Sequence, residues 1–276
     1  MEAGYEYTLG ETLLEAKDLG VQYDGVPILK GVNFAIKNIN RPNRTQGQVD
    51  ALLAPSGMGK TQLFRCIAGL RTPDTGAVYV NQDHQPVQVG MVGVVAQDYP
   101  LFVHLTVLDN LLMPASIKHH DRTKATELVM GLLDKFGLTD RRNLYPHQLS
   151  GGQRQRIAII QQMVCSGHLL LMDEPFSGLD ILMKDEVQHL IAEVAGSDTL
   201  NSVIITTHDI QSAIAVADTI LLLGRERDAA GNVIPGASIR YTYNLMDLGL
   251  TWRPNIAEHP EFTQLEKEIR GRFREL

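Results

Sequence analysis

Ala54-Pro55-Ser56-Gly57-Met58-Gly59-Lys60-Thr61 is the stretch that decides the fold of this chain. It follows a mostly apolar run, 49–53, and a glycine-rich loop between a buried strand and a helix typically surrounds phosphate. Gly57 and Gly59 allow the backbone to bend, so that successive amide N–H groups point at phosphate oxygens. Lys60 can reach the β and γ phosphates, and Thr61 can offer its hydroxyl to magnesium. The stretch therefore predicts a nucleoside triphosphate site at a helix that starts near Lys60.

Three further short apolar runs, 92–96, 169–172 and 203–207, each stop at a residue that can bind phosphate, magnesium or water. The residues at those ends are Gln97, Asp173 with Glu174, and His208. Runs of this length, joined by long helical connections, are typical of buried parallel strands. Because open parallel sheets bind ligands at the carboxyl ends of their strands, these ends and the glycine loop predict one site in an α/β fold.

Leu149-Ser150-Gly151-Gly152-Gln153 lies between the glycine loop and the acidic strand end. Together the three motifs resemble the nucleotide-binding subunit of an ABC (ATP-binding cassette) system, over roughly residues 11–225. The resemblance implies a P-loop NTPase parallel sheet core with an antiparallel β subdomain and an α-helical signature subdomain. It looks most like the separate ATPase subunits of bacterial importers, with the nitrate, sulfonate and taurine group as an analogy.

We divide the chain into an ABC ATPase domain over 1–224 and an extension over 225–276. Within the first, residues 98–165 are predicted to form the helical subdomain. An amphipathic stripe there ends at Gly137 and consists of Ala125, Leu128, Val129, Leu132, Leu133 and Phe136. Alternating segments in 11–37 and at 77–80 predict a small antiparallel sheet, followed by a long polar loop over 37–47.

The extension is predicted to contain a hairpin around 230–232 and a final helix opened by Pro260. Phe262, Leu265, Ile269 and Phe273 would form the apolar stripe of that helix. The pairs Glu266/Arg270 and Glu268/Arg272 are spaced for support across one helical turn.

The resemblance also implies roles for single residues. Glu174 would be the general base for the attacking water, His208 the switch histidine at the γ-phosphate, and Gln97 the glutamine that senses nucleotide state. Thr61, Gln97 and Asp173 would hold Mg²⁺. Tyr23 would stack on adenine, and ATP would be bound by Tyr23, Ala54, Pro55, Ser56, Gly57, Met58, Gly59, Lys60, Thr61 and Gln62.

The motif around Ser150 has a local and an intermolecular interpretation. Ser150 lies three residues before Gln153, so the two can form a capping box at the start of a helix. In the resembled family this capped end faces the γ-phosphate held by a second subunit. The residues that would contact the other subunit's ATP are Ser150, Gly151, Gly152, Gln153 and Asp180.

Two positions depart from the family pattern. Ala54 stands where glycine is usual, and a methyl group there would cost about 1 kcal/mol if the position needs positive φ. Gln62 stands where serine or threonine is more usual, with no evident consequence.

Composition restricts the partners. The formal net charge of −7 argues against nucleic acid, and we expect Cys66 and Cys165 to be buried reduced thiols. His119 and His120 invite a metal site, but a solvated helix start is the better interpretation because no further ligand is near in sequence. With no apolar run of about 18 residues, we expect a cytosolic chain at the inner face of the cell membrane.

The function implied is an ATPase that dimerises around two ATP molecules, as a homodimer or with a paired cassette. It would power solute transport, in the direction of import, through separate transmembrane permease subunits supplied by a substrate-binding protein. Two alternatives stay open at this point: a soluble ABC ATPase in DNA repair or translation, and a catalytically impaired regulatory subunit.

Overall fold

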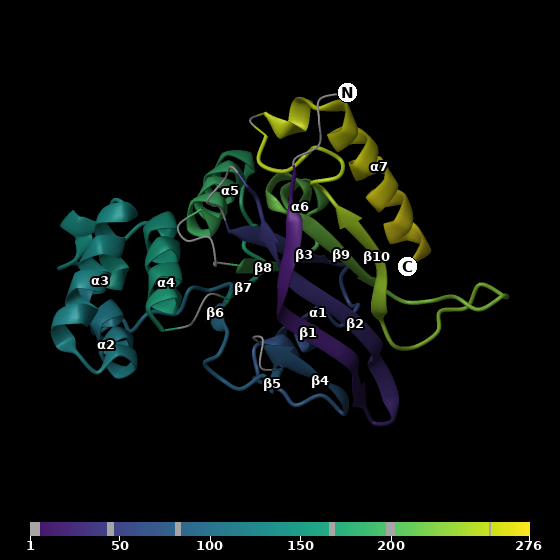
Figure 1. Ribbon diagram of the computed structural model, residues 1–276, viewed down its shortest axis with the longest axis horizontal. Helices are drawn as coiled ribbons and strands as arrows, with labels where there is room; N and C mark the ends of the chain where they lie inside the picture. The colour runs from purple at the N-terminus through teal and green to yellow at the C-terminus, as the bar shows by residue number, and fades with distance from the viewer. Residues whose placement is uncertain (1–5, 43–46, 81–83, 166–168, 197–201, 254) are drawn as a thin grey trace.

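The computed structural model describes residues 6–42, 47–80, 84–165, 169–196, 202–253 and 255–276. Its central sheet has the strand order β10-β9-β3-β8-β7-β6 (Figure 1). Its parallel strands are β3 (Gln48–Leu53), β6 (Gly93–Val95), β7 (Leu169–Asp173), β8 (Ser202–Thr207) and β9 (Thr219–Gly224). β10 (Ser238–Asn244) adds an antiparallel edge. The four predicted apolar runs are confirmed as strands, although β6 is shorter than the run 92–96.

A second, antiparallel sheet has the order β2-β1-β4-β5. Its strands are β1 (Thr8–Tyr23), β2 (Val26–Asn40), β4 (Thr75–Val80) and β5 (Gln85–Pro86). The predicted small sheet is confirmed, but the predicted loop over 37–47 is wrong at its start, because β2 continues to Asn40. Ile39 is buried there and its N–H donates to Gln48 Oε1 at 2.9 Å, so the strand extends beyond Lys37. Residues 43–46 of that predicted loop lie outside the described part of the chain.

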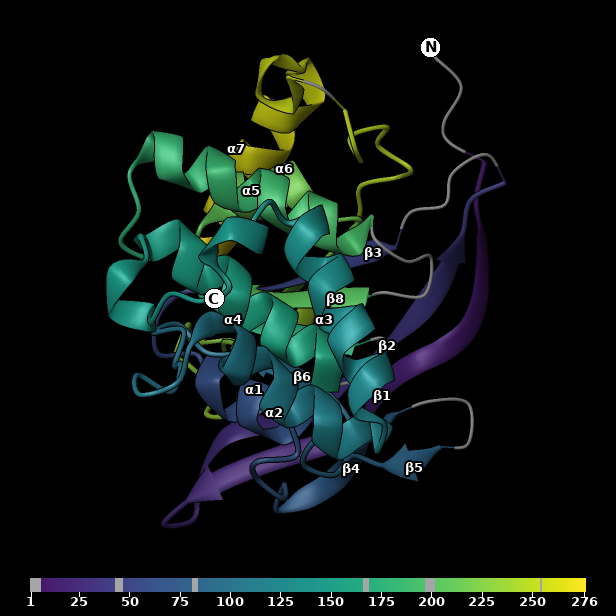
Figure 2. The ribbon, with the colours of Figure 1, turned by 90° about the vertical axis from the view of Figure 1, so that its left-hand side faces the viewer.

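Helices cover the central sheet and build two cores. α1 (Lys60–Ile67) lies between the two sheets, whereas α5 (Ile181–Ala195) and α6 (Ile210–Val216) pack on the other face of the central sheet (Figure 2). Within β3 the burial alternates accordingly: Val49, Ala51 and Leu53 join one core, and Leu52 joins the other. Cys66 of α1 is buried as predicted, and Cys165 is half-buried; both are free thiols.

The predicted helical region contains α2 (Val107–His119), α3 (Arg122–Lys135) and α4 (Gly151–Cys165), which lie together beside the core (Figures 1 and 2). The predicted stripe is confirmed for its four buried members, Ala125, Val129, Leu133 and Phe136, and is narrower than expected because Leu128 is exposed. His119 ends α2 and His120 caps it, so the predicted helix start lies instead at Asp121, whose carboxylate caps α3.

The C-terminal region packs against the core. Its last helix, α7 (Pro260–Glu275), begins at Pro260 and buries Phe262, Leu265 and Ile269, as predicted. The Glu266–Arg270 pair is confirmed, with Nη2 2.6 Å from Oε1. The predicted Glu268–Arg272 ion pair is wrong, because both side chains contact other partners.

Tertiary contacts replace that second pair. The Tyr243 hydroxyl donates to Glu268 at 3.1 Å, while Arg272 contacts Glu275 at 3.2 Å and lies over the Tyr241 ring. The turn around 230–232 is confirmed, because Asp228 accepts from the N–H groups of Ala230 and Asn232.

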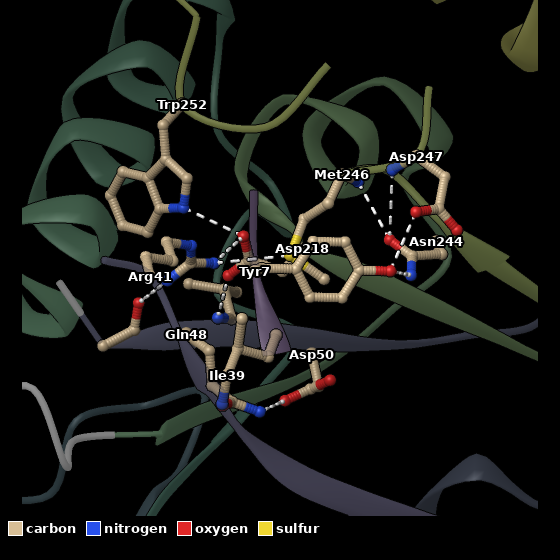
Figure 3. A network of polar contacts seen from close by, with 12 residues as sticks. Tyr7, Ile39, Arg41, Gln48, Asp50, Asp218, Asn244, Met246, Asp247 and Trp252 are labelled. Carbon is tan, nitrogen blue, oxygen red and sulfur yellow. Dashed lines mark hydrogen bonds and ion pairs between the residues drawn. The ribbon is translucent and has the colours of Figure 1, made fainter. Parts of the chain in front are cut away.

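A buried polar network joins the end of β2, the central sheet and the C-terminal region at the end of the sheet where the parallel strands begin (Figure 3). Asp218, just before β9, forms an ion pair with Arg41 and accepts from the N–H of Val49 at 2.8 Å. The indole N–H of Trp252 donates to the same carboxylate at 2.9 Å. Burial raises the pKa of Asp218, and Arg41 opposes that rise. The network therefore connects β2 and the C-terminal region to the amino-terminal ends of the parallel strands, opposite the glycine loop.

Candidate nucleotide-binding site

The glycine loop joins β3 to α1, as predicted. Gly57 and Gly59 have φ of +83° and +84°, in the left-handed region that favours glycine. A methyl group on Gly59 would also lie 2.8 Å from Cγ2 of Ile28, so this glycine is needed for packing as well. α1 begins at Lys60, which confirms the predicted helix start and directs its positive end at the loop.

Ala54 does not impose the backbone strain considered above. It is fully buried, does not have positive φ, and its N–H donates to the carbonyl of Thr207 at 3.2 Å. The expected penalty therefore does not apply, because this position uses ordinary backbone angles that alanine adopts freely.

Three predicted residues meet beside the loop: Lys60 at the start of α1, Glu174 after β7 and His208 after β8. Glu174 forms an ion pair with the ammonium of Lys60 and contacts Nδ1 of His208 at 2.9 Å. It also accepts from the hydroxyl of Thr207 at 3.2 Å. Burial by itself would raise the pKa of Glu174, but hydrogen bonds and charge from Lys60 and His208 outweigh it, so the pKa is lowered. Glu174 is therefore ionised at neutral pH.

The neighbouring backbone fixes these side chains. Glu174 has φ of +45°, an uncommon angle for a non-glycine residue, and its N–H donates to the carbonyl of Thr206 at 2.8 Å. Asp173 accepts from the hydroxyl of Thr206 at 2.6 Å. After His208, Asp209 caps α6 and pairs with Lys184, and these contacts lower the pKa of Asp209 against the effect of its burial.

Thr61, Asp173 and Gln97 offer oxygen atoms of the hard type that Mg²⁺ prefers. Asp173 lies at the end of β7, and Gln97 is exposed just beyond β6, which pairs with β7 through Val95 and Met172. Within the described ranges, no three His, Cys, Asp or Glu side chains group into a metal site. A magnesium ion bound together with phosphates needs only one or two protein ligands, so this donor set fits it.

Ser150, Gly151, Gly152 and Gln153 form the start of α4, and the predicted capping box is confirmed. The N–H of Gln153 donates to the Ser150 hydroxyl at 3.2 Å, and the Gln153 side chain accepts from the Ser150 N–H at 3.0 Å. A methyl group on Gly151 or Gly152 would meet open space. No hydrogen bond or ion pair joins this motif to Lys60, Glu174 or His208 in the described residues. Asp180 is exposed and caps α5 through the N–H of Met183 at 2.9 Å.

Two arginines near the loop were not predicted from the sequence. Arg225, just after β9, donates to the carbonyl of Gly57 at 3.1 Å. Arg71, in the turn after α1, lies over the ring of Tyr23. Neither belongs to a motif, and only the fold brings them to the site. Gln62, which had no predicted consequence, accepts a hydrogen bond from the Tyr23 hydroxyl at 3.0 Å.

Comparison with known proteins agrees with this arrangement. A sulfate/thiosulfate import ATP-binding protein, CysA, from Synechocystis is 40% identical over 205 residues, which cover 73% of this chain and 55% of that protein. A spermidine/putrescine import ATP-binding protein, PotA, from Spiroplasma citri is 34% identical over 214 residues, or 76% of this chain and 59% of that protein. The chain thus spans little more than half the length of these relatives.

The solved structure of CbiO1 from Clostridium perfringens, described as part of the ABC transporter complex CbiONQ, shares the fold. Its TM-score is 0.72 at 24% identity, and the match covers 96% of this chain and 98% of that one. The predicted fold class is therefore confirmed. Since the family model described as ABC transporter matches residues 38–177, which include the glycine loop, the Ser150 motif and the acidic strand end, the chain belongs to the ABC transporter family.

Proposed function

We propose that this chain is an ATP-hydrolysing subunit that dimerises around ATP and powers solute import through a separate membrane permease. The observation that carries the proposal is the meeting of Lys60, Glu174 and His208 beside a glycine loop whose two glycines have positive φ. A phosphate cradle next to an ionised carboxylate is the arrangement that ATP hydrolysis needs. The names of the relatives, import ATP-binding proteins, support the coupling to import.

The ATP site would be formed by Tyr23 and the residues from Ala54 to Gln62. Lys60 would exchange its contact with Glu174 for the β and γ phosphates, which leaves the Glu174 carboxylate free to accept a proton from the attacking water. His208 would then contact the γ-phosphate. Thr61, Gln97 and Asp173 would hold Mg²⁺, which supplies positive charge to the phosphate oxygens.

The second ATP contact would come from another chain. Ser150 to Gln153 and Asp180 would touch the ATP of the partner subunit, either a copy of this chain or a paired cassette. Among the described residues, no atom beyond the adjacent residues and the helix backbone lies within 4 Å of where a Cβ on Gly151 or Gly152 would be, which supports this proposal because a second chain and its ATP could approach the helix start there.

The permease would be a separate protein at the cytoplasmic face of the membrane, served by a substrate-binding protein. No helix within the described residues is long and apolar enough to cross a bilayer. The named relatives carry either sulfate or polyamine names, so they do not identify the solute. The segment after Gln97 presents Phe102 and Val103 to solvent, which suits permease docking there.

Glu174→Gln tests this function because it keeps the side-chain shape and removes the base. The variant should still bind Mg-ATP and accumulate as an ATP-bound dimer, while phosphate release falls about 100-fold or more. Glu127→Gln, an exposed position on α3, is the matched control and should hydrolyse ATP like the wild type. Near wild-type hydrolysis by Glu174→Gln would remove Glu174 as the base.

An inactive wild-type protein, both alone and with its membrane partner, would favour the regulatory-subunit alternative. Co-purification with a nucleic-acid complex and no membrane protein would favour a role in DNA repair or translation.

A further inference from the structure

Tyr23 is the last residue of β1, and its ring is fixed by two side chains from other elements. The guanidinium carbon of Arg71 lies 4.6 Å from the ring centroid. The ring hydroxyl donates to Gln62 Oε1 at 3.0 Å and also contacts Nη1 of Arg71. The Tyr23 side chain nevertheless remains 45% exposed. An aromatic ring that is covered on one face and open elsewhere is prepared to stack a second planar group.

Arg71 and Gln62 are themselves held in place. Arg71 Nη1 lies 3.3 Å from Gln62 Oε1, and Nη2 lies 3.3 Å from Asp74 Oδ2. Asp74 accepts from the backbone N–H of Gln22 at 2.8 Å, which returns the contacts to β1. This hydrogen bond, together with Arg71, lowers the pKa of Asp74. These hydrogen bonds and the ion pair therefore form a closed network that joins the end of β1, the first turn of α1 and the loop after α1.

We propose that Arg71 and Gln62 are positioning residues that orient Tyr23 to stack the purine base of the bound nucleotide. The inference rests on the proposed function, because the base must belong to a nucleotide held by the glycine loop. Gln62 directly follows Thr61, so the ring is tied to the phosphate site by adjacent residues. We call Tyr23, Gln62 and Arg71 the base platform.

The base platform lowers the cost of binding by fixing the ring in advance. A half-exposed tyrosine that sampled several rotamers would lose that freedom when the base arrives, whereas a fixed ring has already lost it. Stacking reads the face of a base and tolerates differences at its edge. The platform should therefore contribute to the affinity for ATP and GTP alike, and contribute nothing for inorganic tripolyphosphate, which has no base.

Dissociation constants for Mg-ATP and for tripolyphosphate test the inference in the full-length protein. Arg71→Ala should weaken ATP binding by about 2- to 5-fold, the scale of an exposed cation–π contact. Gln62→Leu should weaken it in the same direction. In Arg71→Ala, tripolyphosphate binding and the turnover number at saturating ATP should stay unchanged, since Arg71 contacts the Tyr23 ring and acts on the base in the ground state. Arg65→Ala, which removes the same charge from an exposed position on α1, should change neither constant.

A double-mutant cycle gives the decisive comparison. If Arg71 acts through the ring, Arg71→Ala should have no further effect on ATP affinity when Tyr23 is already alanine. An equal loss in both backgrounds, or a loss of tripolyphosphate binding, would overturn the inference. If Tyr23→Ala itself leaves ATP affinity unchanged, the base does not stack there. If the wild type binds no ATP, the proposed function fails as a whole.

Discussion

At the scale of single residues, Asp50 is a carboxylate buried within the central strand β3. Burial raises its pKa to about 7, with nearby Asp218 adding to the rise while Gln48, Thr219 and Arg41 oppose it. Between its ordinary value near 3.8 and about 7, the folded state binds a proton that the unfolded state lacks. Unfolding free energy from this group therefore falls as pH rises through that window.

We predict that Asp50→Asn removes this loss. The unfolding free energy of the variant minus that of the wild type should be larger at pH 8 than at pH 5. The increase should be a few kcal/mol, at about 1.4 kcal/mol per pKa unit. Urea denaturation at the two pH values measures the difference. Asp228→Asn is the control: hydrogen bonds from Asn232 lower the pKa of Asp228, so this carboxylate is ionised at both pH values and its replacement should change stability equally at both. An Asp50→Asn effect that is equal at both pH values would show that Asp50 is ionised throughout.

At the scale of elements, residues of the connection between β9 and β10 contact the glycine loop and the strand beside it. Arg225 donates to the carbonyl of Gly57 at 3.1 Å. Farther along, the N–H of Ala237 donates to the carbonyl of Ile28 at 2.8 Å, and Ile28 lies against Gly59. We predict that Arg225→Ala weakens ATP binding about 5-fold, the scale of one hydrogen bond.

This loss should extend to tripolyphosphate, unlike the loss in Arg71→Ala, because Arg225 supports the phosphate loop and not the base. Arg227→Ala is the control, since that side chain binds the carbonyls of Glu275 and Gly231 instead. Equilibrium binding of both ligands distinguishes the two arginines. Unchanged tripolyphosphate affinity in Arg225→Ala would mean that the loop keeps its shape without this contact.

Local sequence patterns predicted most helices and strands, but they could not predict contacts between residues far apart in the sequence. The helix at Pro260 and the capping box at Ser150 depend on residues within one or two turns, so their spacing is visible in the sequence. Arg41 meets Asp218 across 177 positions, and Arg225 meets Gly57 across 168. No periodicity connects such residues. Asp50 inside an apolar run indicates that a buried charge needs partners, but its hydrogen bond from Gln48 is local.

At the scale of the whole molecule, each chain contains the glycine loop with Lys60 and a separate capped helix end at Ser150. Glu174 pairs with Lys60 beside the loop, and the helix end at Ser150 is exposed, with no neighbouring atom among the described residues where a methyl group on its glycines would lie. If that end completes the partner's site, Ser150→Arg should leave ATP binding to the monomer nearly unchanged. A bulky cation at the interface should abolish ATP-driven dimerisation and reduce hydrolysis to the background of a single chain.

Sedimentation of the Glu174→Gln protein with and without Ser150→Arg, in the presence and absence of Mg-ATP, measures this directly. Trapping the ATP-bound dimer through Glu174→Gln keeps turnover from hiding the association. Ser116→Arg, at a half-buried position in α2 of the same helical group, controls for added charge. Loss of ATP binding by the Ser150→Arg monomer would place the motif in its own chain's site and contradict the shared site, because a residue acting only across the interface cannot change the affinity of an isolated chain.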